Sequence, residues 1–223
     1  MGCMLAIPLP LKGLKDGDID PVIEAPNAEY GLDFLTELHR GEEKVVGKRV
    51  AVIGAGFTAL DCSRVALRLG ADDVSVHIRT TEKYIPVTLE EIFESKREGV
   101  KILGLRTPVG LERDKDGNVT GVRFVQNRLG GYRANGRREA VPIEGSEFVE
   151  PCDTVIVAIG QKTINDVMDI DVGLDRWHNV RVGENGMTSV DGLFAAGDFV
   201  SGATTVVEAV GHGREIAIKL DTW

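Results

Sequence analysis

The sequence predicts an α/β fold: a Rossmann-type parallel sheet with an added antiparallel β-hairpin region. Three observations predict it. Short apolar runs alternate with helix-like segments between residues 49 and 105. A glycine-containing turn joins the first run to its helix, and residues 109–125 alternate around Asp116-Gly117. These patterns are typical of a βαβαβ unit followed by a hairpin.

The elements of the first part follow in chain order. Residues 1–27 are rich in Pro, Gly and Asp and predict an irregular lead-in. Asn27 is expected to cap a helix over residues 28–40, which ends at Gly41. The apolar spacing then predicts strands over residues 49–53, 74–78 and 100–105, and helices over residues 58–69 and 88–97.

The second part begins with the hairpin, whose strands are expected at residues 109–113 and 119–125. Arg133, Arg137 and Arg138 stand among glycines and are expected in an exposed β-loop. A buried strand over residues 154–159 ends at Gly160. The last unit is predicted as a strand over residues 193–196, a turn at Gly197-Asp198 and a helix over residues 206–220.

Composition excludes several classes of protein. Hydrophobic residues make up 43% and charged residues 27%, which suits a chain that buries a core. The net charge of -9 argues against a nucleic-acid or anionic-membrane partner bound through bulk charge. No apolar run is long enough to predict a membrane span. Three cysteines without C-x-x-C spacing indicate a reducing, cytoplasmic location, and no His pair has metal-ligand spacing.

The turn after residue 53 fits the dinucleotide-binding pattern G-x-G-x-x-G/A. Gly54 permits the tight turn, Gly56 lets a pyrophosphate approach the backbone, and Ala59 allows close helix–strand packing. The helix that starts near Thr58 would offer free N–H groups to the phosphates. The alternative interpretation is a tight turn that binds no ligand.

The residues at the end of the second predicted strand indicate which nicotinamide cofactor the site prefers. An NAD site usually has a carboxylate about 20 residues beyond the glycines. Here Arg79 and Thr80 occupy that region, and no carboxylate precedes Glu82. A guanidinium favours a 2′-phosphate, so we expect NADP(H) rather than NAD(H). In the alternative, Arg79 pairs with a surface carboxylate.

Several motifs together resemble the NADPH-dependent flavin oxidoreductases of the glutamate synthase small-subunit family. The family pattern G-G-G-x-T-A-x-D matches residues 54–61, ending at Asp61, and its Tyr-Arg-Arg matches residues 78–80, with Thr80 in place of the second arginine. Residues 142–148, 153–161 and 188–198 also match, so the resemblance runs from about residue 28 to the end.

The resemblance implies roles for residues in both parts. Asp198 would hydrogen-bond the ribityl chain of FAD, the helix start at Thr205 and Val206 would face the flavin ring, and residues 158–160 would form the crossover between domains. Helix capping is the alternative role for Asp198. No catalytic side chain is expected, because hydride transfer requires geometry rather than an acid or base. The expected cofactor-binding residues are Gly54, Gly56, Phe57, Thr58, Ala59, Asp61, Arg79, Thr80, Ala158, Ile159, Gly160, Gly197, Asp198, Thr205 and Val206.

After the lead-in at 1–27, the resemblance implies an NADP(H)-binding domain at 28–158 and the carboxy-terminal segment of an FAD-binding domain at 159–223. The family also has an amino-terminal FAD-binding half with its own glycine fingerprint, and the residues before Val50 do not contain one. We therefore expect a fragment of a longer flavoprotein, or a partner subunit that supplies this half. The unpaired strand at 193–196 favours association, including a homodimer. The electron acceptor is not identified by the sequence, and the alternative function is a nucleotide-binding or electron-transfer adaptor module without catalytic activity.

Overall fold

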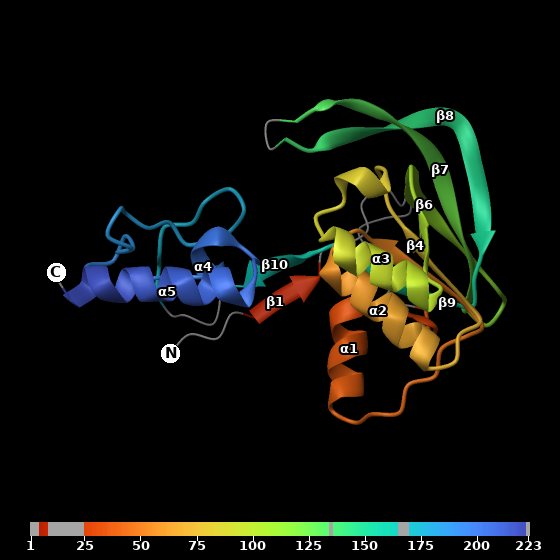
Figure 1. Ribbon diagram of the computed structural model, residues 1–223, viewed down its shortest axis with the longest axis horizontal. Coiled ribbons are helices and arrows are strands. Elements are labelled where there is room, and N and C mark those ends of the chain that lie inside the picture. Colours follow the sequence, from red (N-terminus) through yellow and green to blue (C-terminus); the bar gives the residue numbers. More distant parts are fainter. Residues whose placement is uncertain (1–4, 9–24, 134–135, 165–169, 222–223) are drawn as a thin grey trace. The chain divides into compact units, whose positions relative to one another are not determined.

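The computed structural model describes residues 5–8, 25–133, 136–164 and 170–221. The chain divides into two compact units. The larger comprises Pro10–Gly160, and the smaller comprises Met1–Leu9 together with Gln161–Trp223. Each unit is described by itself below (Figure 1).

The larger unit is organised around a five-stranded parallel sheet with the strand order β2-β9-β3-β4-β5. Val52 at the centre of β3 lies opposite Val76 of β4 on one side and Ile156 of β9 on the other. The apolar runs of β3 and β9 suit a sheet that is covered on both faces. The strands are β2 (Ala28–Tyr30), β3 (Arg49–Gly54), β4 (Asp73–His77), β5 (Lys101–Leu103) and β9 (Thr154–Ala158).

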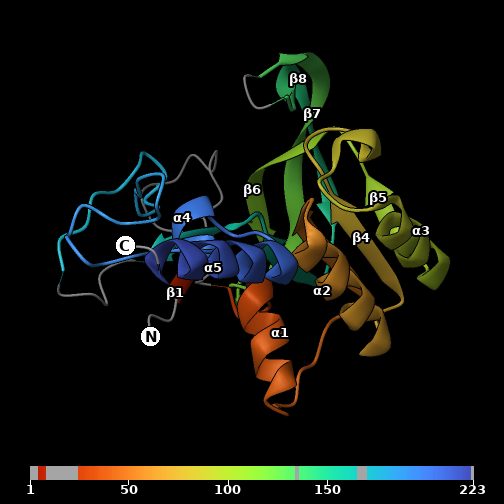
Figure 2. The ribbon, with the colours of Figure 1, turned by 60° about the vertical axis from the view of Figure 1, so that its left-hand side comes forward.

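Three helices cover one face of this sheet and an antiparallel sheet covers the other (Figures 1 and 2). Strand alternation explains the two cores: Val50 and Val52 pack with the helices, whereas Ala51 and Ile53 pack toward the antiparallel sheet. The helices are α1 (Gly31–His39), α2 (Phe57–Arg68) and α3 (Leu89–Glu98), with a short 3₁₀ helix η1 (Glu82–Tyr84) before α3. The predicted parallel unit is therefore confirmed, with α2 and α3 each displaced by one residue at the start.

The antiparallel sheet has the order β6-β7-β8, with β6 at Arg106–Arg113, β7 at Val119–Tyr132 and β8 at Arg138–Pro151. The predicted hairpin is confirmed, but β7 continues well past residue 125 and pairs with β8 as far as Tyr132 and Arg138. The expectation of an exposed β-loop around residues 130–138 is thus wrong at its ends, because residues 130–132 belong to β7 and Arg138 begins β8. The pairing shifts register between Val125 and Asn127 and then continues. The strands therefore extend beyond the alternating pattern of residues 109–125, from which the hairpin was predicted.

The predicted helix start at residue 28 is wrong. Residues 28–30 form the edge strand β2, parallel to β9, and α1 begins only at Gly31. Asn27 does not cap a helix, because its side chain holds two other segments. Its Nδ2 donates to the carbonyls of Val119 and Asp153, and its Oδ1 accepts from Val119 N, all at 2.8 Å.

The smaller unit contains β1 (Leu5–Pro8), antiparallel to β10 (Gln161–Ile164), and the helices α4 (Asp198–Ser201) and α5 (Val206–Asp221). The irregular lead-in is therefore wrong at residues 5–8, and its residues 1–4 and 9–24 lie outside the described residues. The predicted strand at 193–196 is also wrong. Phe194 makes a single antiparallel bridge to Met187, since no neighbouring strand in the described part of this unit extends the ladder.

Across the described ranges, every helix is too short or too polar to cross a bilayer.

Candidate functional site

The carboxyl ends of β3, β4 and β9 meet at one edge of the parallel sheet, where open α/β sheets bind their ligands. Gly54 ends β3, Ala158 ends β9, and Arg79 follows the end of β4. Ten of the sequence-predicted residues belong to this edge and the turns that leave it. They are Gly54, Gly56, Phe57, Thr58, Ala59, Arg79, Thr80, Ala158, Ile159 and Gly160.

Gly54 is required by the packing of the protein itself. It pairs in register with Ala158, and a Cβ added at Gly54 would lie 2.2 Å from the carbonyl oxygen of Ala158. The same Cβ would lie 3.2 Å from the Cβ of Ala59, which is fully buried at the start of α2. Gly54 and the small Ala59 therefore let β3, β9 and α2 approach closely.

Gly56 differs, because nothing in the described protein requires a glycine there. Its backbone angles of φ -100° and ψ 179° suit any residue, and a Cβ added to it would meet no atom within 4 Å. Gly56 is the N-cap position of α2, and neither a side-chain cap nor an acidic residue occupies the first turn. The start of α2 is therefore left open as a positively polarised end of a helix.

A second helix begins beside this turn. α1 starts at Gly31, and a Cβ there would lie 2.9 Å from Cys62 Sγ and 3.3 Å from Thr58 Cγ2. Gly31 thus allows α1 to pack against the start of α2. It was missed from the sequence because the helix was expected to begin three residues earlier. Cys62 donates a hydrogen bond to the Gly31 carbonyl at 3.5 Å, and burial raises the pKa of its thiol to about 12, which makes it a core residue.

Arg79 lies exposed at the end of β4, and its side chain has no hydrogen bond or ion pair to any residue that the structure describes. Its backbone carbonyl accepts a hydrogen bond from Asn127 Nδ2 at 2.9 Å. Glu82, the first carboxylate after the strand, is paired with Lys96 of α3 at 2.6 Å. The surface ion pair that the alternative interpretation of Arg79 requires is thus absent from the described residues.

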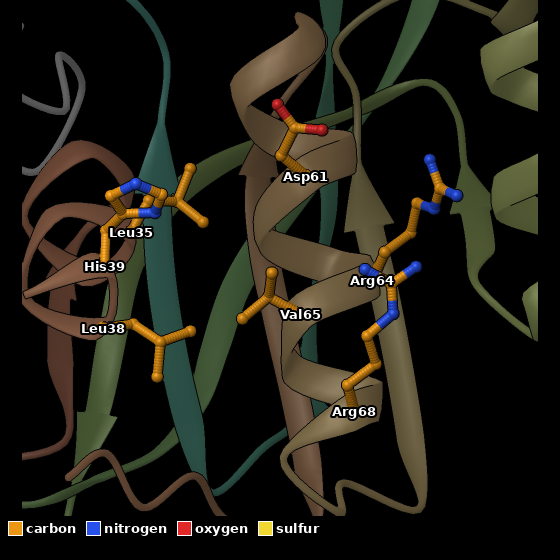
Figure 3. A pocket seen from close by; sticks show the side chains of 7 residues that line it. All are labelled: Leu35, Leu38, His39, Asp61, Arg64, Val65 and Arg68. Carbon is orange, nitrogen blue, oxygen red and sulfur yellow. The ribbon is translucent and has the colours of Figure 1, made fainter. Parts of the chain in front are cut away.

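Asp61 lies one helical turn beyond Phe57, in a groove between α1 and α2 of about 480 Å³ (Figure 3). Leu38 and Val65 face each other across this groove, while Arg64 and Arg68 extend away from α1. Burial and the nearby Glu91 raise the pKa of Asp61, and Arg64 opposes the shift. The structure therefore places Asp61 in the lining of this groove, one turn of α2 after the glycine turn.

The titratable residue that ends β4 is His77, which belongs to the core. His77 ends β4 and is only 2% exposed, with its ring stacked 4.4 Å from that of Phe124. Burial and the neighbouring Arg106 lower its pKa to about 3, so His77 is neutral at physiological pH. Its Nε2 hydrogen-bonds with Ser75 Oγ at 2.9 Å, which indicates a core role.

The remaining predicted residues lie in the smaller unit. Gly197 has a φ of +64°, which favours glycine, and its N–H donates to His212 Nδ1 at 3.1 Å. Asp198 accepts hydrogen bonds from the hydroxyl of Thr204 at 2.9 Å and from its N–H at 3.3 Å, so this carboxylate orders the loop between α4 and α5. Val206, the first residue of α5, is 79% exposed.

Thr205 and Glu208 form a capping box at the start of α5. The hydroxyl and N–H of Thr205 donate to Glu208 Oε2 at 2.8 and 3.0 Å, and Glu208 N donates back to Thr205 Oγ1 at 3.2 Å. These bonds lower the pKa of Glu208. Glu208 is therefore a capping residue.

The parallel sheet, its glycine turn and the covering antiparallel sheet define a Rossmann-type α/β protein. The chain belongs to the pyridine nucleotide-disulphide oxidoreductase family, whose model matches residues 2–213.

Curated relatives agree with the resemblance drawn from the motifs, which is confirmed. The chain is 36% identical over 216 residues to the NADPH-Fe(3+) oxidoreductase subunit beta of Geobacter sulfurreducens, with 86% of this chain and 32% of that protein covered. It is 36% identical over 222 residues to the glutamate synthase [NADPH] small chain of Escherichia coli, with 95% of this chain and 47% of that protein covered. The chain thus spans a third to a half of the length of these relatives.

Solved structures share the fold. The thioredoxin reductase of T. acidophilum matches with a TM-score of 0.69 at 20% identity, covering 97% of this chain and 62% of that one. FprA of Mycobacterium tuberculosis in complex with NADPH matches with a TM-score of 0.69 at 15% identity, covering 96% and 61%.

Proposed function

We propose that this chain is the NADPH-binding portion of a flavin-dependent oxidoreductase, with residues 28–158 as its NADP(H)-binding domain. The observation that carries the proposal is the contrast between Gly54 and Gly56. The fold requires the first glycine, whereas the second faces open space at the start of α2. A pyrophosphate that approaches the backbone at Gly56 explains why a side chain is absent there.

The charge distribution favours NADP(H) over NAD(H). Arg79 presents a guanidinium without a protein partner in the described structure, and the carboxylate of Glu82 is occupied by Lys96. A 2′-phosphate would pair with the guanidinium, whereas a ribose 2′-hydroxyl would find no free carboxylate in this segment. The relatives named above carry NADPH in their names, which supports the same preference.

The residues of this chain would bind and orient the dinucleotide rather than take part in chemistry. Bound NADPH would supply the hydride, and a flavin would receive it. The open start of α2 would stabilise the phosphates, and the edge at Ala158 would border the site. Because His77 is buried and neutral, we do not assign it a role in carrying protons.

FAD binding would involve the smaller unit, with residues 159–223 as the carboxy-terminal segment of an FAD-binding domain. Gly197, Asp198 and the start of α5 at Thr205 and Val206 are the proposed contacts. Asp198 has one oxygen committed to Thr204, which leaves its other oxygen for a ribityl hydroxyl. The rest of the FAD site would come from the remainder of a longer protein or from a partner subunit, since the relatives are named as subunits or small chains.

Nucleotide titration of the purified chain tests the proposal. We expect NADPH to bind with a lower dissociation constant than NADH, measured by calorimetry. A yellow protein whose flavin absorbance is bleached by NADPH would support the full oxidoreductase. A colourless protein that binds NADPH would support the nucleotide-binding adaptor instead, and failure to bind either nucleotide at millimolar concentration would refute both.

A further inference from the structure

Cationic and aromatic side chains from η1 and from the distal ends of β7 and β8 form a cluster. The guanidinium of Arg138, at the start of β8, lies 4.9 Å from the ring centroid of Tyr132 and 5.9 Å from that of Tyr84. The ammonium of Lys83 lies 5.8 Å from the Tyr84 ring centroid. The long β7–β8 hairpin thus brings an arginine against the segment that follows β4.

The positive charges of this cluster are not neutralised. Neither Lys83 nor Arg138 forms a salt bridge within the described ranges, although the chain as a whole carries a net charge of -9. The nearby carboxylates are already engaged, Glu82 by Lys96 at 2.6 Å and Glu139 by Arg133 at 3.6 Å. In addition, Arg138 Nε is buried without an acceptor among the described residues, and such a donor is usually completed by a water, an ion or a ligand.

The hairpin contacts both ends of the segment from Arg79 to Tyr84, which includes η1. At one end, Asn127 of β7 donates to the carbonyl of Arg79, and at the other, Arg138 packs on Tyr84. Arg79, Lys83 and Arg138 therefore flank one short segment. That segment has Thr80 where the resembling family has a second arginine.

We infer that Arg138, assisted by Lys83, completes the binding site for the 2′-phosphate of NADP(H). Arg138 would take over the role of the family's second arginine, whose position is occupied by Thr80 in this chain. This inference rests on the proposed function. The chemistry is that of a phosphomonoester on an adenosine ribose: a dianion suits a guanidinium that keeps its full charge and has a free N–H. The rings of Tyr84 and Tyr132 fix the guanidinium without neutralising it.

The test compares 2′,5′-ADP with 5′-ADP, which differ by this phosphate alone. Dissociation constants would be measured by calorimetry for the full chain and for Arg138→Gln, Lys83→Gln and Arg128→Gln. Arg128 is the matched control, because it lies exposed on β7 and has no partner among the described residues. We expect Arg138→Gln to weaken 2′,5′-ADP about tenfold and Lys83→Gln about threefold, with 5′-ADP unchanged within about twofold and no effect of Arg128→Gln.

The outcomes separate this inference from the function on which it rests. If the wild type binds 2′,5′-ADP and NADPH but Arg138→Gln binds 2′,5′-ADP as tightly, the inference is wrong and the proposed function stands. If Arg138→Gln weakens both nucleotides equally, Arg138 has a structural role and the inference is again wrong. If the wild type binds neither nucleotide nor NADPH, both fail. Arg138→Lys, which keeps the charge, should recover part of the 2′,5′-ADP affinity and of its dependence on salt.

Discussion

Substituting the two glycines of the turn one at a time separates the needs of the fold from those of the ligand. In Gly54→Ala the new Cβ would lie 2.2 Å from the carbonyl oxygen of Ala158, well inside the 3.0 Å below which real Cβ contacts essentially do not occur. β3 and β9 would have to move apart by about 0.8 Å at the centre of the parallel sheet. Overpacking of this kind costs about 1–3 kcal/mol, and the rigid backbone partner favours the upper end.

Gly56→Ala should leave the fold intact. The new Cβ would meet no atom of the described part of the chain within 4 Å, and a φ of -100° is ordinary for alanine. Removing a glycine from the unfolded chain stabilises by about 0.4–1 kcal/mol, whereas alanine is a poorer N-cap than glycine by a similar amount. The two effects oppose each other, so the free energy of unfolding should change by less than about 1 kcal/mol.

The assay pairs a thermal melt with an NADPH titration of each variant. For a chain of this size about 1 kcal/mol corresponds to 2–4 °C, so Gly54→Ala should melt about 5–12 °C lower and Gly56→Ala within about 3 °C of the wild type. Gly56→Ala should nevertheless bind NADPH at least about tenfold more weakly, because its methyl group occupies the approach of the pyrophosphate. Wild-type affinity in a folded Gly56→Ala protein would refute the reasoning.

Three further predictions concern selectivity, pH and stability. Arg79→Ala should weaken NADPH about tenfold or more but NADH less than about twofold, and equal losses in calorimetry would contradict a 2′-phosphate role. The pKa of His77 is lowered from 6.5 to about 3, so between these pH values the unfolded chain binds a proton that the folded chain does not. The free energy of unfolding should therefore rise with pH across this window. His77→Phe should reduce this pH dependence, measured by urea unfolding at several pH values. An unchanged slope would mean that His77 is not the buried neutral group. Asn27→Ala should destabilise the larger unit by about 1–3 kcal/mol, because it leaves partly buried backbone groups of Val119 and Asp153 without their partner, and a loss below about 0.5 kcal/mol would show that water replaces the amide.

The sequence predicted those elements whose evidence is local. The apolar run of β3, the glycine turn and the Asp116-Gly117 hairpin each contain their own signal, and each appears in the structure. Asn27 shows the limit of such signals, since an asparagine before a helical pattern suits a cap as well as a bridge between distant strands. The bridge reaches Val119 and Asp153, which no local pattern connects to it.

The other errors have the same origin in long-range pairing. Residues 193–196 have the composition of a buried strand, but a strand exists only where a neighbour supplies hydrogen bonds, and Phe194 finds a single bridge. Likewise Arg138 reaches Tyr84 only because β7 and β8 stay paired beyond the register shift at Val125. The glycine turn could thus be located from the sequence, whereas the cationic cluster at η1 and the β7–β8 hairpin could not.

The unequal surroundings of Gly54 and Gly56 have a consequence for the descent of such chains. A lineage that stops binding nucleotide would still be held to glycine at position 54 by the Ala158 carbonyl. Position 56 would be free to change, because no atom of the described residues opposes a side chain there. A related chain that keeps the first glycine but has lost the second would therefore be expected to retain the fold without binding the nucleotide.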